Sequence, residues 1–114
     1  MNRDIIRNWS ELPWEPIRPD VAFRVLGSGL VPNGADIQAV TLTRVESKGE
    51  FSTHADNYHH VFLFLEGYGE GWIGDESYEI TPGLIVRVAA GQSHGYRNTN
   101  YSDLILLTIN YLGI

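Results

Sequence analysis

The chain has 114 residues, of which 43% are hydrophobic and 19% charged, and its formal net charge is −6 at pH 7. This length and composition favour one compact domain and exclude a disordered chain or a second domain. The acidic charge argues against nucleic acid as a partner, because it would repel a phosphate backbone. The sequence contains no cysteine, which excludes disulfides, thiolate metal ligands and a cysteine nucleophile.

Neither a targeting segment nor a membrane span is expected. No long apolar run follows residues 1–4, and the longest apolar stretch, residues 61–65, is too short to cross a membrane. We therefore expect a cytoplasmic protein without membrane contact. A chain of this length buries roughly two thirds of its unfolded surface, so association into a homodimer would add useful burial.

Residues 1–20 are expected to form an extended N-terminal arm before a barrel domain at 21–114. Three prolines in this segment cannot lie in a helix interior or a central strand: Pro13, Pro16 and Pro19. Trp9 and Trp14 need cover, which a sheet of the same chain or of a partner would provide. One helical turn after Trp9, with Ser10 as its cap, is the longest helix expected here. We expect a homodimer to form through this arm.

From residue 21 onward, short β-prone runs alternate with Gly, Pro, Asn and Asp turn signals. No segment of twelve or more residues shows the 3.6-residue apolar period of an amphipathic helix. The twelve glycines suit tight turns and barrel corners. The pattern predicts an all-β antiparallel sandwich or barrel. The expected strands are 21–26 (ending at the glycines that follow), 37–45, 58–65, 69–73, 77–80, 84–88, 94–97 and 103–111.

The four histidines fall in two places of the chain, with His54, His59 and His60 in one short window and His94 alone. A single histidine is usually a hydrogen-bonded core or surface residue, but a cluster beside a carboxylate suits a metal ion. His54, Asp56 and His60 share one parity, which places them on one face of an extended chain together with Phe62 and Phe64. His59 has the opposite parity and is expected outside, although a loop between 54 and 60 would leave the choice of His59 or His60 open.

Two segments resemble the two conserved motifs of the cupins. In the first, G-x5-H-x-H-x3-4-E-x6-G, Gly67 is the last glycine, His60 takes the glutamate position, and Asp56 takes the second histidine position after His54. Gly49 lies one residue closer than the first glycine should. The second, G-D-x4-P-x-G-x2-H-x3-N, matches at four positions, with Leu84 and Ala89 replacing aspartate and proline: Gly83, Gly91, His94 and Asn98.

This resemblance covers residues 36–111 and implies a double-stranded β-helix, the jelly-roll barrel of the cupins. It also implies a metal site of three histidines and one carboxylate, with the carboxylate and one histidine exchanged in position here: His54, Asp56, His60 and His94. One divalent ion (Zn, Ni, Fe or Mn) is expected. Asp56 could instead act as a base or orient a ligating histidine, and a metal-free descendant of the family is the alternative to the site as a whole.

His54, Asp56 and His94 also satisfy the facial triad of non-haem iron oxygenases. The chain is short for a 2-oxoglutarate-dependent enzyme and offers no clear Ser/Arg pair for that co-substrate.

Four further residues are candidates for the substrate pocket: Tyr96, Phe62, Arg87 and Trp72. A solvated position on the rim is the more ordinary interpretation for Arg87, and core packing for Phe62 and Trp72. Tyr96 should share the face of His94, because it follows it by two positions. The chain is similar in size to many one-domain cupins. That resemblance implies an isomerase, epimerase, lyase or dioxygenase, or a protein that binds sugars without catalysis. A metal-dependent enzyme acting on a sugar derivative or a keto or hydroxy acid is therefore the first functional hypothesis. A non-catalytic binding or sensor barrel is the second, and a storage or structural barrel the third.

Overall fold

A computed structural model describes residues 6–31 and 38–113 of the chain. This description leaves out residues 1–5, which begin the expected arm, and residue 37, the first residue of the expected strand 37–45. The described residues contain one short 3₁₀ helix, η1 (Trp9–Glu11), and no helix long and apolar enough to span a membrane. The strands are β1 (Glu15–Pro16), β2 (Ala22–Gly29), β3 (Ala39–His54), β4 (His59–Glu66), β5 (Gly69–Ile73), β6 (Glu76–Ile80), β7 (Ile85–Val88), β8 (His94–Asn98) and β9 (Leu104–Tyr111).

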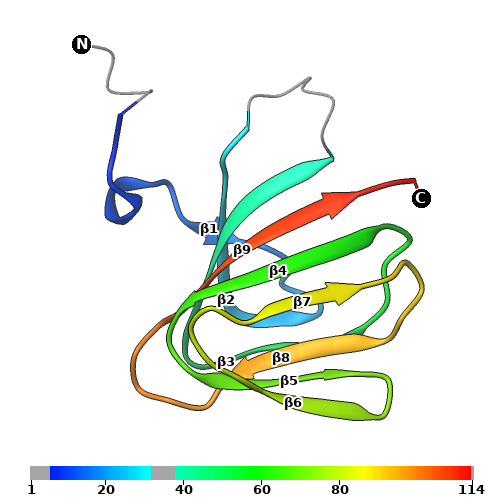
Figure 1. Ribbon diagram of the computed structural model, residues 1–114. Helices are drawn as coiled ribbons and strands as arrows, with labels where there is room; N and C mark the ends of the chain where they lie inside the picture. Colours follow the sequence, from blue (N-terminus) through cyan, green and yellow to red (C-terminus); the bar gives the residue numbers. More distant parts are fainter. Residues whose placement is uncertain (1–5, 32–37, 114) are drawn as a thin grey trace.

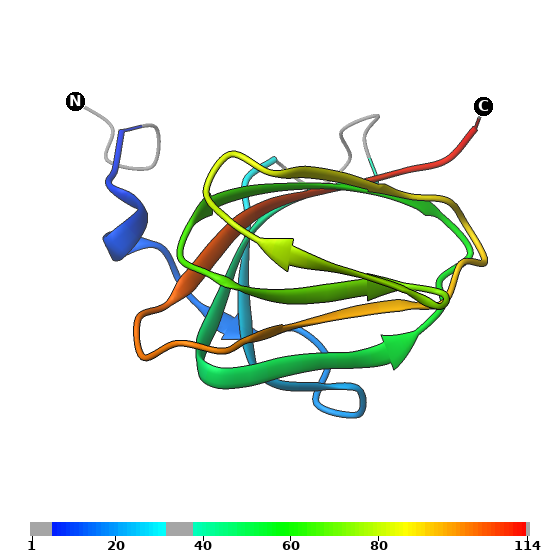
Figure 2. The same ribbon diagram turned by 60° about the horizontal axis from the view of Figure 1, so that its bottom comes forward.

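The strands form a single antiparallel sheet that curls around a central core (Figures 1 and 2). Its main path runs β6-β5-β8-β3-β9-β4-β7, while β2 pairs with β3 and β1 pairs with β2. The long strand β3 joins the two halves of the barrel, because its first part pairs with β9 and its last part pairs with β8. The predicted all-β antiparallel jelly roll, the double-stranded β-helix, is confirmed.

Alternate residues of the strands fill the interior, as period-2 side-chain placement requires. Aromatic and aliphatic groups make one core: Val25, Val45, Phe51, Phe62, Phe64, Ile80, Val86, Val88, Tyr96, Leu104 and Leu106. On three of these strands the same parity continues into polar residues at one end. His60 precedes Phe62, His94 precedes Tyr96, and Thr108 follows Leu106 by two positions. The barrel therefore has an apolar body and a polar end.

Two strands are longer than the sequence predicted. β2 continues through Gly29 instead of stopping at residue 26, and β3 continues nine residues beyond the expected end at Val45. The two pair with each other from Gly29 opposite Thr41 to Ala22 opposite Phe51. Gly27 lies inside this ladder. A side chain would not fit there, because a Cβ would lie 2.8 Å from Cγ1 of Ile17. This glycine permits a close approach rather than a turn.

The described part of the arm packs on the sheet of its own chain. β1 pairs with β2, which leaves Pro16 on an edge strand, where a missing N–H is tolerated. The cap of η1 is Asn8, not the predicted Ser10, because Asn8 Oδ1 accepts a hydrogen bond from Ser10 N at 3.0 Å. The Arg44 guanidinium lies 5.9 Å from the centre of the Trp14 ring and covers part of it.

Candidate metal centre

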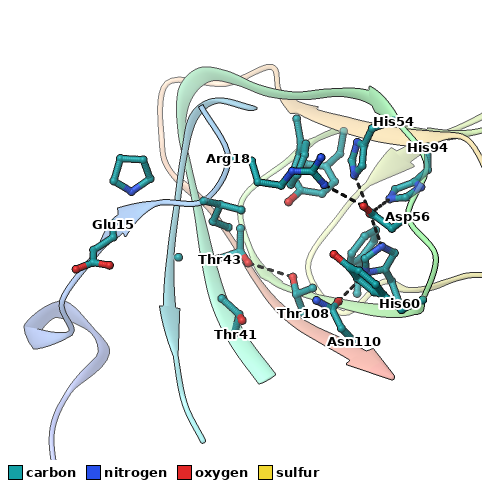
Figure 3. A pocket seen from close by; sticks show the side chains of 17 residues that line it. Glu15, Arg18, Thr41, Thr43, His54, Asp56, His60, His94, Thr108 and Asn110 are labelled. Atoms are coloured by element: carbon teal, nitrogen blue, oxygen red, sulfur yellow. Dashed lines mark hydrogen bonds and ion pairs between the residues drawn. The ribbon is translucent and has the colours of Figure 1, made fainter. Parts of the chain in front are cut away.

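The sheet brings two distant segments of chain together at the polar end of the barrel. His54 is the last residue of β3 and pairs with His94, the first residue of β8. Asp56 lies in the short connection that follows β3, and His60 lies on β4 opposite Asn110 of β9. Together they line one wall of a cavity of about 260 Å³ (Figure 3).

One carboxylate oxygen is the meeting point of the three imidazoles. Oδ2 of Asp56 lies 2.9 Å from Nε2 of His60, 3.2 Å from Nε2 of His54 and 3.8 Å from Nε2 of His94. The other oxygen, Oδ1, accepts a hydrogen bond from Nη1 of Arg18 at 2.9 Å. Figure 3 shows Asp56 between the histidines, with the Arg18 side chain reaching it from the arm. All three rings therefore present the same nitrogen to the same atom.

The opposite nitrogen of each ring is held by an oxygen. Nδ1 of His54 lies 2.7 Å from the carbonyl oxygen of Ser52, and Nδ1 of His94 lies 2.8 Å from that of Gln92. Nδ1 of His60 lies 2.7 Å from Oδ1 of Asn110. A carbonyl oxygen only accepts, so each Nδ1 carries the proton and donates it. In the neutral ring, Nε2 then offers a lone pair, which is the arrangement found in metal-ligating histidines.

Burial makes this arrangement costly without a cation. The side chains of His94 and Asp56 are 2% and 8% exposed. His94 Nε2 is buried and has no hydrogen-bond partner among the described residues. Burial lowers the pKa of His94 to about 4, partly offset by its hydrogen bond to Gln92, so the ring is neutral at pH 7. Lone pairs of nitrogen and a carboxylate oxygen thus face one another, and a positive charge between them would satisfy both.

Asp56 remains ionised in spite of its burial. Burial by itself raises the pKa of this carboxyl group. The neighbouring imidazoles of His60 and His54 and the hydrogen bond from Arg18 outweigh it and hold the pKa below its ordinary value of 3.8. The site therefore contains one fixed negative charge, which favours a divalent cation.

The spacing of the ligand atoms fits a metal ion. His54, Asp56 and His94 form a group whose possible ligand atoms all lie within 4.8 Å of one another. His60 adds a fourth possible ligand atom, the third nitrogen, next to Asp56. Bonds of about 2.1 Å from nitrogen or oxygen to zinc place neighbouring ligand atoms about 3 to 3.5 Å apart. The three distances to Asp56 Oδ2 lie around that range, so this oxygen and the three nitrogens are spaced as ligand atoms of one ion would be.

The other residues singled out by the sequence divide between the inside and the outside of the barrel. Tyr96 and Phe62 line the cavity. His59 lies outside it, where its Nδ1 accepts a hydrogen bond from Ala90 N and its Nε2 donates to the carbonyl oxygen of Gly113. Arg87 and Trp72, two of the pocket candidates, also lie outside the cavity.

Strand parity explains both corrections. Val86 and Val88 point inward, so the intervening Arg87 is exposed. Trp72 is paired with Gly95, the neighbour of the inward-facing Tyr96, and therefore packs on the outer face. Its Nε1 donates to Oγ1 of Thr53.

Several polar residues that line the cavity were missed from the sequence. Arg18 belongs to the arm, 38 residues before its partner Asp56, and nothing local in the sequence signals that contact. Asn110 and Thr108 could have been found, because they continue the inward parity of Leu106 on the last strand. Thr108 shares a hydrogen bond of 3.0 Å with Thr43, which gives the cavity a hydroxyl-bearing wall.

Comparison with solved structures shows the same fold in several proteins. A predicted oxalate decarboxylase from Thermotoga maritima superposes with a TM-score of 0.80 at 20% identity, over 95% of this chain and 99% of that one. The polyketide cyclase RemF from Streptomyces resistomycificus gives 0.79 at 21% identity, over 92% and 78% of the two chains. KdgF from Halomonas sp. gives 0.74 at 12% identity, over 90% and 91%. At these identities the likeness concerns the fold.

The family of the chain is assigned from its sequence. No curated protein gives a significant match to the chain. Residues 41–110, however, match the family described as Cupin domain. That segment contains most of β3, all of β4 to β8 and nearly all of β9, and thus Asp56 and the three histidines around its Oδ2. The chain belongs to the cupin family.

Proposed function

We propose that this cupin binds one divalent metal ion through His54, Asp56, His60 and His94. The observation that carries this proposal is the convergence of three Nε2 atoms on Asp56 Oδ2, with each Nδ1 held by an oxygen. Zn, Ni, Fe and Mn all accept imidazole and carboxylate ligands, and the ligand set does not select among them. The His54–Asp56–His94 subset equally suits the facial triad of an iron site.

We further propose that the protein is a metal-dependent enzyme acting on a small polar metabolite, such as a keto or hydroxy acid or a sugar derivative. A bound divalent ion supplies Lewis acidity toward a carbonyl or enol oxygen. The chain contributes a small cavity, in which Phe62 and Tyr96 exclude water on the apolar side. Thr43 and Thr108 offer hydroxyl groups on another wall. This combination of an apolar wall and a few polar groups is typical of a site for a small ligand.

A second candidate is a barrel that binds its ligand without catalysis. It is favoured by the scarcity of uncommitted acid–base groups among the described residues that line the cavity. Asp56 is held by Arg18 and the histidines, and the remaining carboxylate, Glu15, is exposed on the arm. Thermal stabilisation by keto acids or sugars without turnover would support this candidate, whereas turnover of any of them would support the enzyme.

The metal proposal is tested by elemental analysis of purified protein. The double variant H54A/H94A removes two of the three imidazoles, so we expect wild-type protein to retain close to one ion per chain and the double variant to retain almost none. H59A is the matched control, because it removes a neighbouring imidazole that lies outside the cavity. Equal metal content in wild type and H54A/H94A would refute the site.

We also propose a homodimer formed through the arm. Ile6 and Trp9, which flank or form η1, are 60% and 38% exposed. Together on a short segment they offer an apolar patch that a second chain would cover. A small domain also benefits from the additional buried surface.

A further inference from the structure

Arg18 is brought into the cavity by the backbone of the arm. Ile17 N donates a hydrogen bond to the carbonyl oxygen of Val25 at 3.1 Å, which ties the residue before Arg18 to β2. The carbonyl oxygen of Arg18 accepts from the N–H groups of Val21 and Ala22, at 3.2 and 2.8 Å. The backbone is therefore held on both sides, and the side chain extends from the arm toward Asp56 (Figure 3).

The guanidinium is only partly committed. One N–H donates to Oδ1 of Asp56, and Nε lies 4.0 Å from Asp20, a weaker and more exposed ion pair. Arginine has five N–H donors in a planar fork, so several remain available for an oxygen ligand. The side chain is 38% exposed and thus accessible from the cavity mouth. A fork of this kind matches the two oxygens of a carboxylate better than any neutral group.

The charge of the cavity also favours a negatively charged ligand. Among the described residues that line it, Arg18 is the only lysine or arginine, and Asp56 is the only buried carboxylate. A divalent ion, Asp56 and Arg18 together give the interior a net charge of about +2, counting the imidazoles as neutral. The chain as a whole has a net charge of −6. A small anion would neutralise this local excess, whereas a neutral sugar would leave it.

From these observations we infer that Arg18 is the anchor for a carboxylate group of the substrate, so that the ligand class is a small carboxylic acid rather than a neutral sugar. This inference rests on the proposed metal function, and it selects among the ligand classes given there. The cavity volume of about 260 Å³ restricts the ligand to a small acid. The carboxylate would take the free donors of Arg18 while the arginine keeps its bond to Asp56.

The test is calorimetric titration of zinc-loaded protein with lactate and with its neutral amide, lactamide. We expect lactate to bind wild type more tightly than lactamide does. R18Q should weaken lactate binding about 10- to 100-fold, as expected for loss of a charge-assisted hydrogen bond, and leave lactamide unchanged. R18K should be intermediate, since it keeps the charge but not the fork. R87Q is the matched control, an exposed arginine outside the cavity that should bind as wild type does.

Three results would overturn the inference. The first is equal lactate affinity in wild type and R18Q, and the second is no lactate binding by zinc-loaded wild type. The third is loss of zinc from R18Q, which would show that Arg18 acts by positioning Asp56 and not by holding the ligand. Failure of wild-type protein to take up zinc is a different outcome, since it rejects the metal site itself. Zinc content is therefore measured for each variant beside its titration.

Discussion

Burial determines the protonation state of His94 at neutral pH. Its side chain is 2% exposed and its Nε2 has no protein partner among the described residues, while its Nδ1 donates to a backbone carbonyl. Such a ring resists protonation, because burial disfavours the charged form and little water can reach it. A neutral ring is also the form that binds a metal ion.

This burial predicts a pH-dependent stability for chelator-treated protein. The pKa of His94 falls from 6.5 to about 4 on folding, so between these pH values the unfolded chain binds a proton that the folded chain does not. The free energy of unfolding should therefore decrease as the pH falls from about 6.5 to about 4, by about 3 kcal/mol from this residue. Urea unfolding at a series of pH values measures the slope.

The variant H94N should flatten that slope, and H59N should leave it unchanged. The carboxyl group of Asp56 does not act in the same window, because its pKa is held below 3.8 and its contribution is lost only at lower pH. A slope that is identical in wild type and H94N would contradict the assigned cause.

The sequence predicted much of the site at this scale, because strand parity and motif spacing are local. The inward face shared by His60, Phe62 and Phe64 follows from parity along β4, whereas Asp56 meets His54 and His60 through the connection between β3 and β4. Two pocket candidates were placed wrongly because strand parity was not applied to them. Arg87 and Trp72 were chosen for their chemistry, although the parity of Val86 and Tyr96 places them outside. Arg18 reaches Asp56 only through the pairing of β1 with β2, which no local pattern encodes.

Among the secondary-structure elements, the pairing of β8 with β3 determines the position of His94. Gly95 follows His94, and a Cβ at this position would lie 2.5 Å from Cζ2 of Trp72 and 2.7 Å from the carbonyl oxygen of Phe51. The backbone of Phe51 cannot move without moving His54 on the same strand. The glycine therefore lets β8 approach β3 closely enough for the two histidines to meet.

G95A should therefore lower the free energy of unfolding by about 2 to 3 kcal/mol, within the range for overpacked sites. G29A is the matched control, since Gly29 also lies in a strand but has no atom within 4 Å of the place that a Cβ would take. We expect G29A to change stability by about 0.5 kcal/mol or less. Urea denaturation of both variants is the measurement, and equal stability of G95A and G29A would show that the close approach is not required.

Strand existence was easier to predict than strand length. Every expected strand has a counterpart in the structure, because hydrophobic runs between turn signals are a local property. β2 and β3 were predicted too short, since glycines that usually mark turns are used here for close packing, as at Gly27. The second half of β3 carries charged and small residues and becomes a strand through its pairing with β8 and β2.

For the whole molecule, the dimer proposal predicts a mass in solution. The chain has a mass of 12.8 kDa, so light scattering after size-exclusion chromatography should give about twice that value. The variant I6S/W9S should shift the protein to a single chain, because it removes the exposed apolar groups around η1. I85S removes a comparably exposed group on β7 and should remain dimeric. Monomeric wild-type protein, or a dimer that persists in I6S/W9S, would refute association through the arm.

The carbonyl groups of Ser52 and Gln92 each hold the ring of the histidine two residues later. Both oxygens belong to the main chain, so the orientation of these two rings depends on backbone geometry and survives side-chain replacement at either position. Their rotational freedom is lost when the barrel folds and not when a ligand arrives. Folding thus bears the entropic cost of orienting the site, and an incoming ion would meet two donors already in place.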